Sequence, residues 1–143
     1  MQFKGDVSLK ESRFQIIGKP KITKIQFEIN KEFVFKDEVS IELNSNIQII
    51  KNNDEQKHDS IVVLNIGIFT SKNLSDVPFR IDIEVEGHFM WDDKLAEDTF
   101  QLDSMLKQNA PAILYSYLRP IITLITVEAN IPPLVIPLMN FCE

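Results

Sequence analysis

Four segments of the chain follow the apolar and polar patterns of β-strands. In three of them the apolar side chains recur at every second position, which is typical of strands with one buried face. The remaining segment, residues 61–70, is apolar on both faces and predicts a central strand. In chain order, the apolar positions of the three alternating segments are Ile25, Phe27 and Ile29; Val39, Ile41, Leu43, Ile47 and Ile49; and Phe79, Ile81, Ile83, Val85, Phe89 and Trp91.

The links between these segments are short. Residues 51–59 are polar and charged and predict a hairpin loop, and residues 71–78 carry the Asn, Ser, Asp and Pro typical of turns. Strands joined by short links pair antiparallel. Gly87, inside the last strand, predicts a bulge or a close backbone approach. The link over 30–37 contains Phe33, Val34 and Phe35, and burial under the sheet edge is the favoured explanation for them.

After Trp91 the pattern becomes helical. Residues 104–129 form a broadly apolar helix with a narrow polar stripe, made of Ser116, Arg119, Thr123 and Thr126. The carboxylates at 92, 93, 97 and 98 precede it, where they favour the positive end of the helix dipole. Pro120 predicts a kink or a division, and the three prolines in 131–137 predict extended chain. Strands followed by a helix predict an α+β fold with the helix packed on one sheet face.

Length and charge narrow the class of protein. The 143 residues predict one domain, 1–143, and the net charge of −6 disfavours nucleic acid and anionic membranes as partners. A single cysteine, Cys142, cannot form an internal disulfide, which is typical of a reducing compartment and favours the cytoplasm. The first six residues lack the apolar core of a signal peptide. Because Arg119, Glu128 and several prolines interrupt the most apolar segment, we expect no membrane span.

The sequence offers little for catalysis. His58 has two interpretations, a metal site with Asp54, Glu55 and Asp59 or a solvated loop, and the loop is favoured because no second histidine or cysteine follows at ligand spacing. The paired carboxylates at 92–93 and 97–98 resemble an acid/base pair, but helix-start residues explain them better. The four glycines are scattered and form no phosphate-binding loop. We therefore expect neither an enzyme nor a metal or cofactor.

Several motifs together resemble one family. The run P-A-I-L-Y-S-Y-L-R at 111–119 is similar to a P-N-I-L-F-P-Y-A-R-like run of SecB, the bacterial export chaperone that holds unfolded preproteins. The ending I-P-P-L-V-I-P-L-M-N-F at 131–141 is similar to its T-F-P-x-L-x-L-x-P-V-N-F-like ending at similar spacing. Upstream, I-Q-F-E at 25–28 resembles I-S-F-E, and 79–89 resembles a strand that ends in glycine. The resemblance depends on the order and spacing of these four motifs, and it covers most of the chain from about residue 14.

The resemblance implies a four-stranded antiparallel sheet with a long helix on one face. It also implies a homotetramer, a dimer of dimers with helices between the sheets, in which unfolded chains lie in hydrophobic grooves. An acidic outer sheet face would dock the motor SecA. Lys24 and Arg80 depart from the family pattern, since many members carry aspartate and leucine there, and Pro120 replaces a helix-compatible residue. Typical members also continue beyond the position of Glu143, so the expectation of SecA docking is weakened.

From these features we predict an ATP-independent holdase that binds unfolded preproteins for Sec-dependent export. The alternative is a SecB-like chaperone or adaptor dedicated to one client, such as an antitoxin, without SecA docking. The client-groove candidates, for each of which ordinary packing is the competing explanation, are Phe33, Phe35, Ile131, Leu134 and Ile136. The SecA-docking candidates are Glu28, Asp82, Glu84 and Glu86. The oligomer-interface candidates are Ile113, Leu114, Tyr117, Leu118, Ile121 and Ile125.

Overall fold

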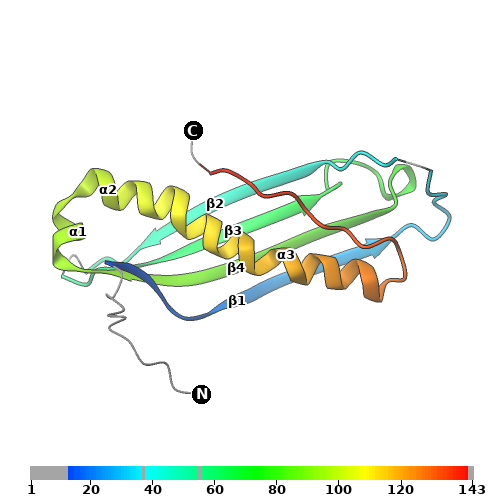
Figure 1. Ribbon diagram of the computed structural model, residues 1–143. Helices are drawn as coiled ribbons and strands as arrows, with labels where there is room; N and C mark the ends of the chain where they lie inside the picture. Colours follow the sequence, from blue (N-terminus) through cyan, green and yellow to red (C-terminus); the bar gives the residue numbers. More distant parts are fainter. Residues whose placement is uncertain (1–12, 37, 55, 142–143) are drawn as a thin grey trace, which may run out of the picture.

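The computed structural model describes residues 13–36, 38–54 and 56–141 (Figure 1). The first six residues, Glu55 and Cys142 lie outside this range. The strands are β1 (Phe14–Ile29), β2 (Leu43–Lys51), β3 (Asp59–Ile68) and β4 (Phe79–Trp91). The helical elements are the turn η1 (Leu74–Asp76) and then α1 (Asp93–Glu97), α2 (Thr99–Ser104), η2 (Met105–Asn109) and α3 (Ala110–Glu128). The strands pair antiparallel in the order β1-β4-β3-β2, which confirms the predicted fold class.

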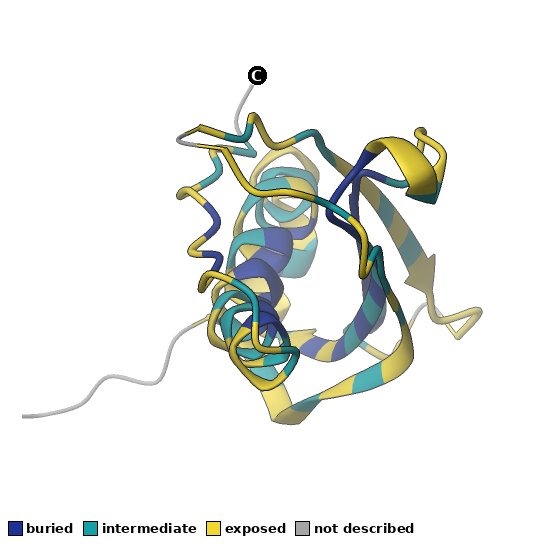
Figure 2. Ribbon diagram, turned by 90° about the vertical axis from the view of Figure 1, so that its right-hand side faces the viewer, coloured by how far each residue is buried: buried dark blue, intermediate teal, exposed yellow. Residues whose placement is uncertain are grey.

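The two inner strands follow their predicted patterns. β3 lies between β4 and β2 and is largely buried on both faces, as its apolar sequence predicts. Along β4 the buried positions alternate with partly exposed ones, from Phe79 to Phe89. Figure 2 shows this alternation along the sheet, with the helical layer on one side of it only. The apolar face of β4 therefore points to the helix and its charged face to solvent.

The two outer strands differ from the prediction. β1 has 16 residues and is far longer than the part that alternates in the sequence. Its register with β4 shifts between Ile17 and Lys21 and between Ile22 and Lys24, and these shifts interrupt the alternation in the rest of the strand. Gly18 has φ 72° at the first shift, a backbone conformation that suits glycine. β2 begins only at Leu43, so the predicted strand residues Val39 and Ile41 lie before it.

A local turn explains the late start of β2. Its partner β3 ends at Ile68, and the next residue, Phe69, has φ 59°. The Phe69 N–H donates to the Glu42 carbonyl at 2.9 Å and closes the ladder. Residues 39–41 therefore have no strand opposite them and belong to the link 30–42, which crosses the end of the sheet from β1 to β2 (Figure 1).

The helix begins earlier than predicted. Asp92 and Asp98 are N-caps, since their carboxylates accept from the N–H groups of Leu95 at 2.8 Å and Gln101 at 3.0 Å. Helical structure then runs without a break from Thr99 to Glu128. The predicted division at Pro120 is wrong, because α3 continues through that residue. Within this run the turn η2 is π-helical rather than α-helical. It ends shortly before Pro111, which has no N–H to donate to the preceding turn.

One face of the helical layer closes the core. Gly87 of β4 allows the close approach that the sequence predicted, because a Cβ there would lie 2.9 Å from Leu114 Cδ2. The fully buried helix residues on this face are Leu106, Ala110, Leu114, Leu118 and Ile122. They pack on inward-facing residues of β3 and β4, such as Leu64, Ile66, Ile81, Ile83 and Val85.

The C-terminal segment folds back over the helix. Asn130, with φ 58°, follows α3 and reverses the chain. Residues 131–141, named the tail below, form neither helix nor strand, as the prolines predicted. In Figure 1 the tail runs back along α3 toward β2. The tail is thus an extended segment laid on one side of the helix.

Candidate functional site

Polar side chains of α3 hold the backbone of the tail. Arg119 Nε donates to the Ile136 carbonyl at 3.1 Å, and Thr123 Oγ1 donates to the Leu134 carbonyl at 2.7 Å. Tyr115 OH donates to the Pro137 carbonyl. Burial raises the pKa of the Tyr115 phenol, so the hydroxyl stays protonated and keeps this donor. Of the predicted polar stripe, Arg119 and Thr123 therefore donate to the tail, and Thr126 Oγ1 accepts from the Leu134 N–H. Tyr115 is a further donor that the sequence did not reveal.

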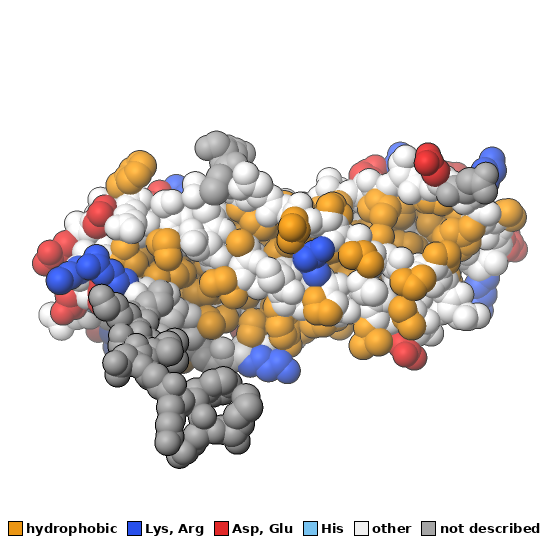
Figure 3. All heavy atoms as spheres, in the orientation of Figure 1, with side chains coloured by type: hydrophobic (Ala, Val, Ile, Leu, Met, Phe, Trp, Pro, Cys, Tyr) orange, Lys and Arg blue, Asp and Glu red, His pale blue; other side chains and the backbone are white. Residues whose placement is uncertain are grey.

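The tail and the link 30–42 enclose an apolar cleft of about 280 Å³. Phe69 and Phe79 lie at the cleft with their rings edge to face, 5.5 Å apart. Its lining residues are Phe35, Lys36, Val39, Ile41, Phe69, Pro78, Phe79, Pro132, Pro133 and Leu134. Figure 3 shows hydrophobic side chains around a hollow near the right-hand end of the molecule, where these segments lie. An apolar cleft open to solvent is the feature expected of a site for apolar ligands.

Two of the five predicted groove residues line this apolar cleft. Phe35, 41% exposed, lies on the side of the link, and Leu134 lies on the side of the tail. Phe33 packs edge-on against Phe35, with ring centroids 5.2 Å apart, and Ile131 is half-buried beside the core. Ile136 is fully buried, so in this chain it is a core residue with no surface to offer a ligand.

Most of the cleft could not be predicted from the sequence pattern. The alternation placed Val39 and Ile41 on a strand face and Phe69 in a central strand. Their place at the cleft follows from the end of the β2–β3 ladder at Phe69, which frees the segment before β2. The part played by Pro132 and Pro133 could have been predicted, since paired prolines next to Leu134 favour a stiff extended segment that can form a cleft wall.

An apolar stripe on α3 remains partly exposed beside the core. Leu114 and Leu118, predicted for an oligomer interface, are fully buried in the core of this chain. The other predicted members of that interface remain partly accessible: Ile113, Tyr117, Ile121 and Ile125. Leu124, 57% exposed, continues the stripe. With Phe27 of β1, Leu124 and Ile125 also line an open hollow of about 380 Å³.

Basic residues accompany the predicted acidic face of the sheet. Lys24 Nζ lies 2.9 Å from Asp82 Oδ2, and Asn65 Nδ2 donates to Asp82 Oδ1 at 2.8 Å. The bond from Lys24, followed by that from Asn65, lowers the pKa of the Asp82 carboxyl against the opposing effect of burial. The other docking candidates also stand opposite cations in the register, as Lys21↔Glu86, Lys24↔Glu84 and Glu28↔Arg80. This face is therefore largely charge-compensated.

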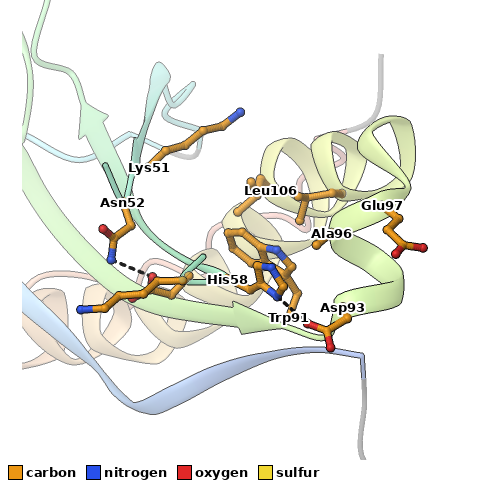
Figure 4. Close-up of a pocket in the computed structure, with 11 residues that line it drawn as sticks. Lys51, Asn52, His58, Trp91, Asp93, Ala96, Glu97 and Leu106 are labelled. Atoms are coloured by element: carbon orange, nitrogen blue, oxygen red, sulfur yellow. Dashed lines mark hydrogen bonds and ion pairs between the residues drawn. The ribbon is translucent and has the colours of Figure 1, made fainter. Parts of the chain in front are cut away.

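A second pocket, of about 540 Å³, lies at the opposite end of β2 from the apolar cleft (Figure 4). His58 Nδ1 lies 3.2 Å from Asp93 Oδ1 beside Trp91. His88 Nε2 lies 2.6 Å from Asp59 Oδ2, and the hydrogen bonds from His88 and Asn52 lower the pKa of Asp59. Within the described ranges no three His, Cys, Asp or Glu residues are grouped as metal ligands would be.

The comparisons with known proteins agree with this fold. The family described as preprotein translocase subunit SecB matches residues 9–143. The uncharacterized protein MJ0357 of Methanocaldococcus jannaschii is 33% identical over 117 residues, which cover 81% of this chain and 72% of that protein. The chain belongs to the SecB family. Membership makes chaperone function, rather than catalysis, the class of activity that is supported.

A solved structure shares the architecture at low sequence identity. The Mycobacterium tuberculosis Rv1957 SecB-like chaperone, in complex with a ChAD peptide from the Rv1956 HigA1 antitoxin, superposes with a TM-score of 0.66 at 14% identity. The match covers 90% of this chain and 88% of that chain. A Streptococcus agalactiae protein of unknown function matches with a TM-score of 0.45 at 12% identity, over 88% of this chain and 99% of that one.

One helical run of the described residues, Thr99–Glu128, is strongly apolar. The run Thr99–Glu128 has 30 residues and a mean hydropathy of 1.4 in its most apolar window, which is long and apolar enough to cross a membrane. We expected Arg119, Glu128 and several prolines to interrupt this segment, and in the structure Arg119 and Pro120 lie inside one continuous helix. In this fold the helix packs its inner face on the sheet, as the core helix of the domain.

Proposed function

We propose that this protein is an ATP-independent holdase that binds apolar segments of unfolded preproteins. The observation that carries the proposal is the open apolar cleft between the tail and the link 30–42, on a SecB-family fold. Burial of a client side chain contributes about 25 cal/mol per Å² of apolar surface, and this attraction has no preferred direction. We therefore expect the cleft to accept many different client sequences. Binding of the unfolded client lowers the concentration of free unfolded chains and so reduces their aggregation by mass action.

The test measures aggregation of a chemically denatured client after dilution, without nucleotide. Ile41→Glu places a charge at the cleft, where Ile41 is 43% exposed, and should abolish the protection. Val34→Glu is the matched control, because Val34 lies in the same link, is 75% exposed and does not line the cleft. Equal protection by both variants would contradict the assignment of the cleft.

We also propose that the exposed stripe of α3 is covered by other copies of the chain, in a homotetramer built as a dimer of dimers. The large apolar side chains left accessible support this proposal, since a monomer rarely exposes such a continuous patch. Helices of two dimers would then cover each other. Leu114 and Leu118 are not part of this surface, since the core of each chain buries them.

The handover of clients has two candidate routes. In the first, Glu28, Asp82, Glu84 and Glu86 dock SecA for Sec-dependent export from the cytoplasm. In the second, the protein serves one client, such as an antitoxin, without SecA; the antitoxin peptide bound to the structurally similar Rv1957 chaperone motivates this alternative. Competition separates a general holdase from a dedicated one, because unrelated unfolded proteins displace a client from the former only.

A further inference from the structure

Both histidines of the chain form ion pairs at the closed end of the β2–β3 hairpin. The sequence contains two histidines, His58 and His88. His58 Nδ1 lies 3.2 Å from Asp93 Oδ1, and His88 Nε2 lies 2.6 Å from Asp59 Oδ2. His58 and Asp59 are consecutive, so the histidine of one pair and the carboxylate of the other belong to the same short segment. The two pairs therefore connect this segment to two different elements, α1 and β4.

The two pairs lie on opposite faces of the sheet. Asp59 meets His88 on the outer face, where the charged positions of β4 lie. The Trp91 N–H donates to the His58 carbonyl at 3.1 Å, so His58 stands opposite Trp91 and its side chain points to the helical side. In Figure 4 the Asp93 carboxylate of α1 points toward His58, beside the Trp91 ring. The start of β3 is thus held from both faces.

Asp59 also binds the other arm of the hairpin. Its Oδ1 accepts from Asn52 Nδ2 at 2.9 Å, and Asn52 directly follows β2. The hydrogen bond from His88, followed by that from Asn52, lowers the pKa of the Asp59 carboxyl. The carboxylate therefore keeps its charge at pH values at which histidine is protonated. Asn52, His58 and Asp59 are named the hairpin base below.

The other charged residues around the hairpin base are carboxylates and lysines. The pocket of Figure 4, named the hairpin pocket below, brings four of them to His58, namely Lys51, Lys57, Asp93 and Glu97. On the side of His88 they are Asp59, Lys51, Glu86 and the register partner of Glu86, Lys21. Carboxylates and lysines ordinarily keep their charge between about pH 5 and 8, whereas histidine changes its charge in this range. Among the described residues at this site, the two imidazoles are therefore the groups that respond to pH near neutrality.

We propose that the hairpin base controls access to the hairpin pocket in response to pH. While both imidazoles are protonated, the charged pairs hold the base on α1 and β4. As the pH rises through the range in which histidine loses its proton, each pair loses the attraction between opposite charges, and the remaining hydrogen bond is weaker. The base then opens more often, and the pocket floor at Trp91, Leu102 and Leu106 becomes more accessible.

The two pairs should contribute unequally. The Asp59 side chain is 23% exposed and has both oxygens bound, whereas the Asp93 side chain is 94% exposed. Water screens an exposed pair more strongly than a half-buried one. The pair of His88 and Asp59 is therefore the main pH-dependent contact of the hairpin base.

Amide hydrogen exchange, followed by NMR, measures the opening of the hairpin base. The Trp91 N–H is the reporter, because its bond to the His58 carbonyl breaks when the base leaves β4. The Leu134 N–H, which donates to buried Thr126, is the reference in another part of the fold. Protection factors at pH 5.5 and 8.5 correct for the pH dependence of the chemical exchange. Quenching of Trp91, the single tryptophan, by neutral acrylamide measures access to the pocket floor.

We expect the protection factor of the Trp91 N–H to fall about fivefold from pH 5.5 to 8.5, as for the loss of two exposed ion pairs, while that of Leu134 stays constant. The quenching of Trp91 should rise over the same range. His88→Gln keeps a hydrogen-bond donor without a titrating charge and should remove most of the fall. Asp93→Asn should remove a smaller part. Asp103→Asn is the matched control, because Asp103 pairs with Lys107 instead of a histidine, and it should keep the whole fall.

The proposal is overturned if the protection of the Trp91 N–H does not depend on pH, or if the fall persists in a variant with both His88→Gln and Asp93→Asn. An equal fall at Leu134 also overturns it, because the whole fold would then respond. Quenching of Trp91 that stays constant contradicts the control of access. If circular dichroism shows that the double variant is unfolded, Asp93→Asn decides, since equal behaviour of Asp93→Asn and Asp103→Asn overturns the proposal. The apolar cleft shares none of these residues, so the holdase is tested separately.

Discussion

The Leu134 N–H donates to Thr126 Oγ1 at 2.9 Å, and the Thr126 side chain is fully buried. The same hydroxyl donates to the Thr123 carbonyl at 2.7 Å, so both of its hydrogen-bonding roles are filled. Thr123 in turn donates to the Leu134 carbonyl. One residue of the tail is therefore fixed through both backbone groups. Because Leu134 also lines the apolar cleft, these threonines set the position of one cleft wall.

Thr126→Val tests this arrangement. Valine has nearly the same shape but leaves the buried Leu134 N–H without an acceptor, which costs about 1–3 kcal/mol. We expect the free energy of unfolding, measured by urea denaturation, to fall by this amount, and client affinity to fall with it. Thr126→Ser keeps the hydroxyl and should retain the client affinity. A valine variant with unchanged stability and affinity would show that the bond does not hold the wall.

The helix shows which part of such a site a sequence predicts. Its apolar periodicity and the interruption by Arg119, Thr123 and Thr126 were visible, and the prolines correctly predicted an extended tail. The contact between this polar stripe and the tail could not be predicted, because a polar stripe on a helix is equally typical of solvent exposure. What the donors bind depends on the reversal at Asn130, a long-range feature that periodicity does not contain.

The sheet shows the same limit. β4 keeps strict alternation over most of its length, so its faces were predicted correctly. The prediction missed more than half of β1, because register shifts near Gly18 and Ile22 break its alternation. Its pairing with β4 rather than β2 also brings Lys24 next to Asp82, and that ion pair could not be read from local pattern.

The two faces of β4 should respond differently to substitution. Ile83 is fully buried, so Ile83→Asp places an unpaired charge in the core at a cost of several kcal/mol, and the fold or the assembly should fail. Glu84 lies on the outer face, and Glu84→Ala should change the free energy of unfolding by less than about 0.5 kcal/mol. Circular dichroism with thermal melts measures both. Similar losses would contradict the register.

The helix stripe should control assembly without controlling the fold. Leu124→Asp changes an exposed position and should lower the mass measured by light scattering while the circular dichroism spectrum is retained. Leu118→Asp changes a fully buried position and should unfold the chain instead. We expect a tetramer for the unmodified protein. A stable monomer at micromolar concentration would contradict the proposed assembly, and the stripe would then need another partner.

The charge compensation on the outer sheet face predicts weak SecA binding that can be strengthened. Lys24 neutralises Asp82 directly, and Arg80 stands opposite Glu28 in the register. Lys24→Asp with Arg80→Leu removes both cations, so the negative potential of the face rises and attracts a basic partner more strongly.

Calorimetric titration with SecA from the same organism measures the effect. The double variant should bind more tightly than the unmodified chain at low salt. The difference should shrink as salt is added, because charges are screened over about 8–10 Å near physiological ionic strength.

Glu28→Lys with Asp82→Lys is the opposite change on the same face and should abolish binding. Glu32→Lys with Glu38→Lys makes the same change in net charge and is the control, because both residues are exposed in the link 30–42 and stand outside the paired face of β1. If neither the unmodified chain nor the Lys24/Arg80 variant produces heat or a complex at low salt, this face does not dock SecA. The dedicated-client route would then be the one that remains.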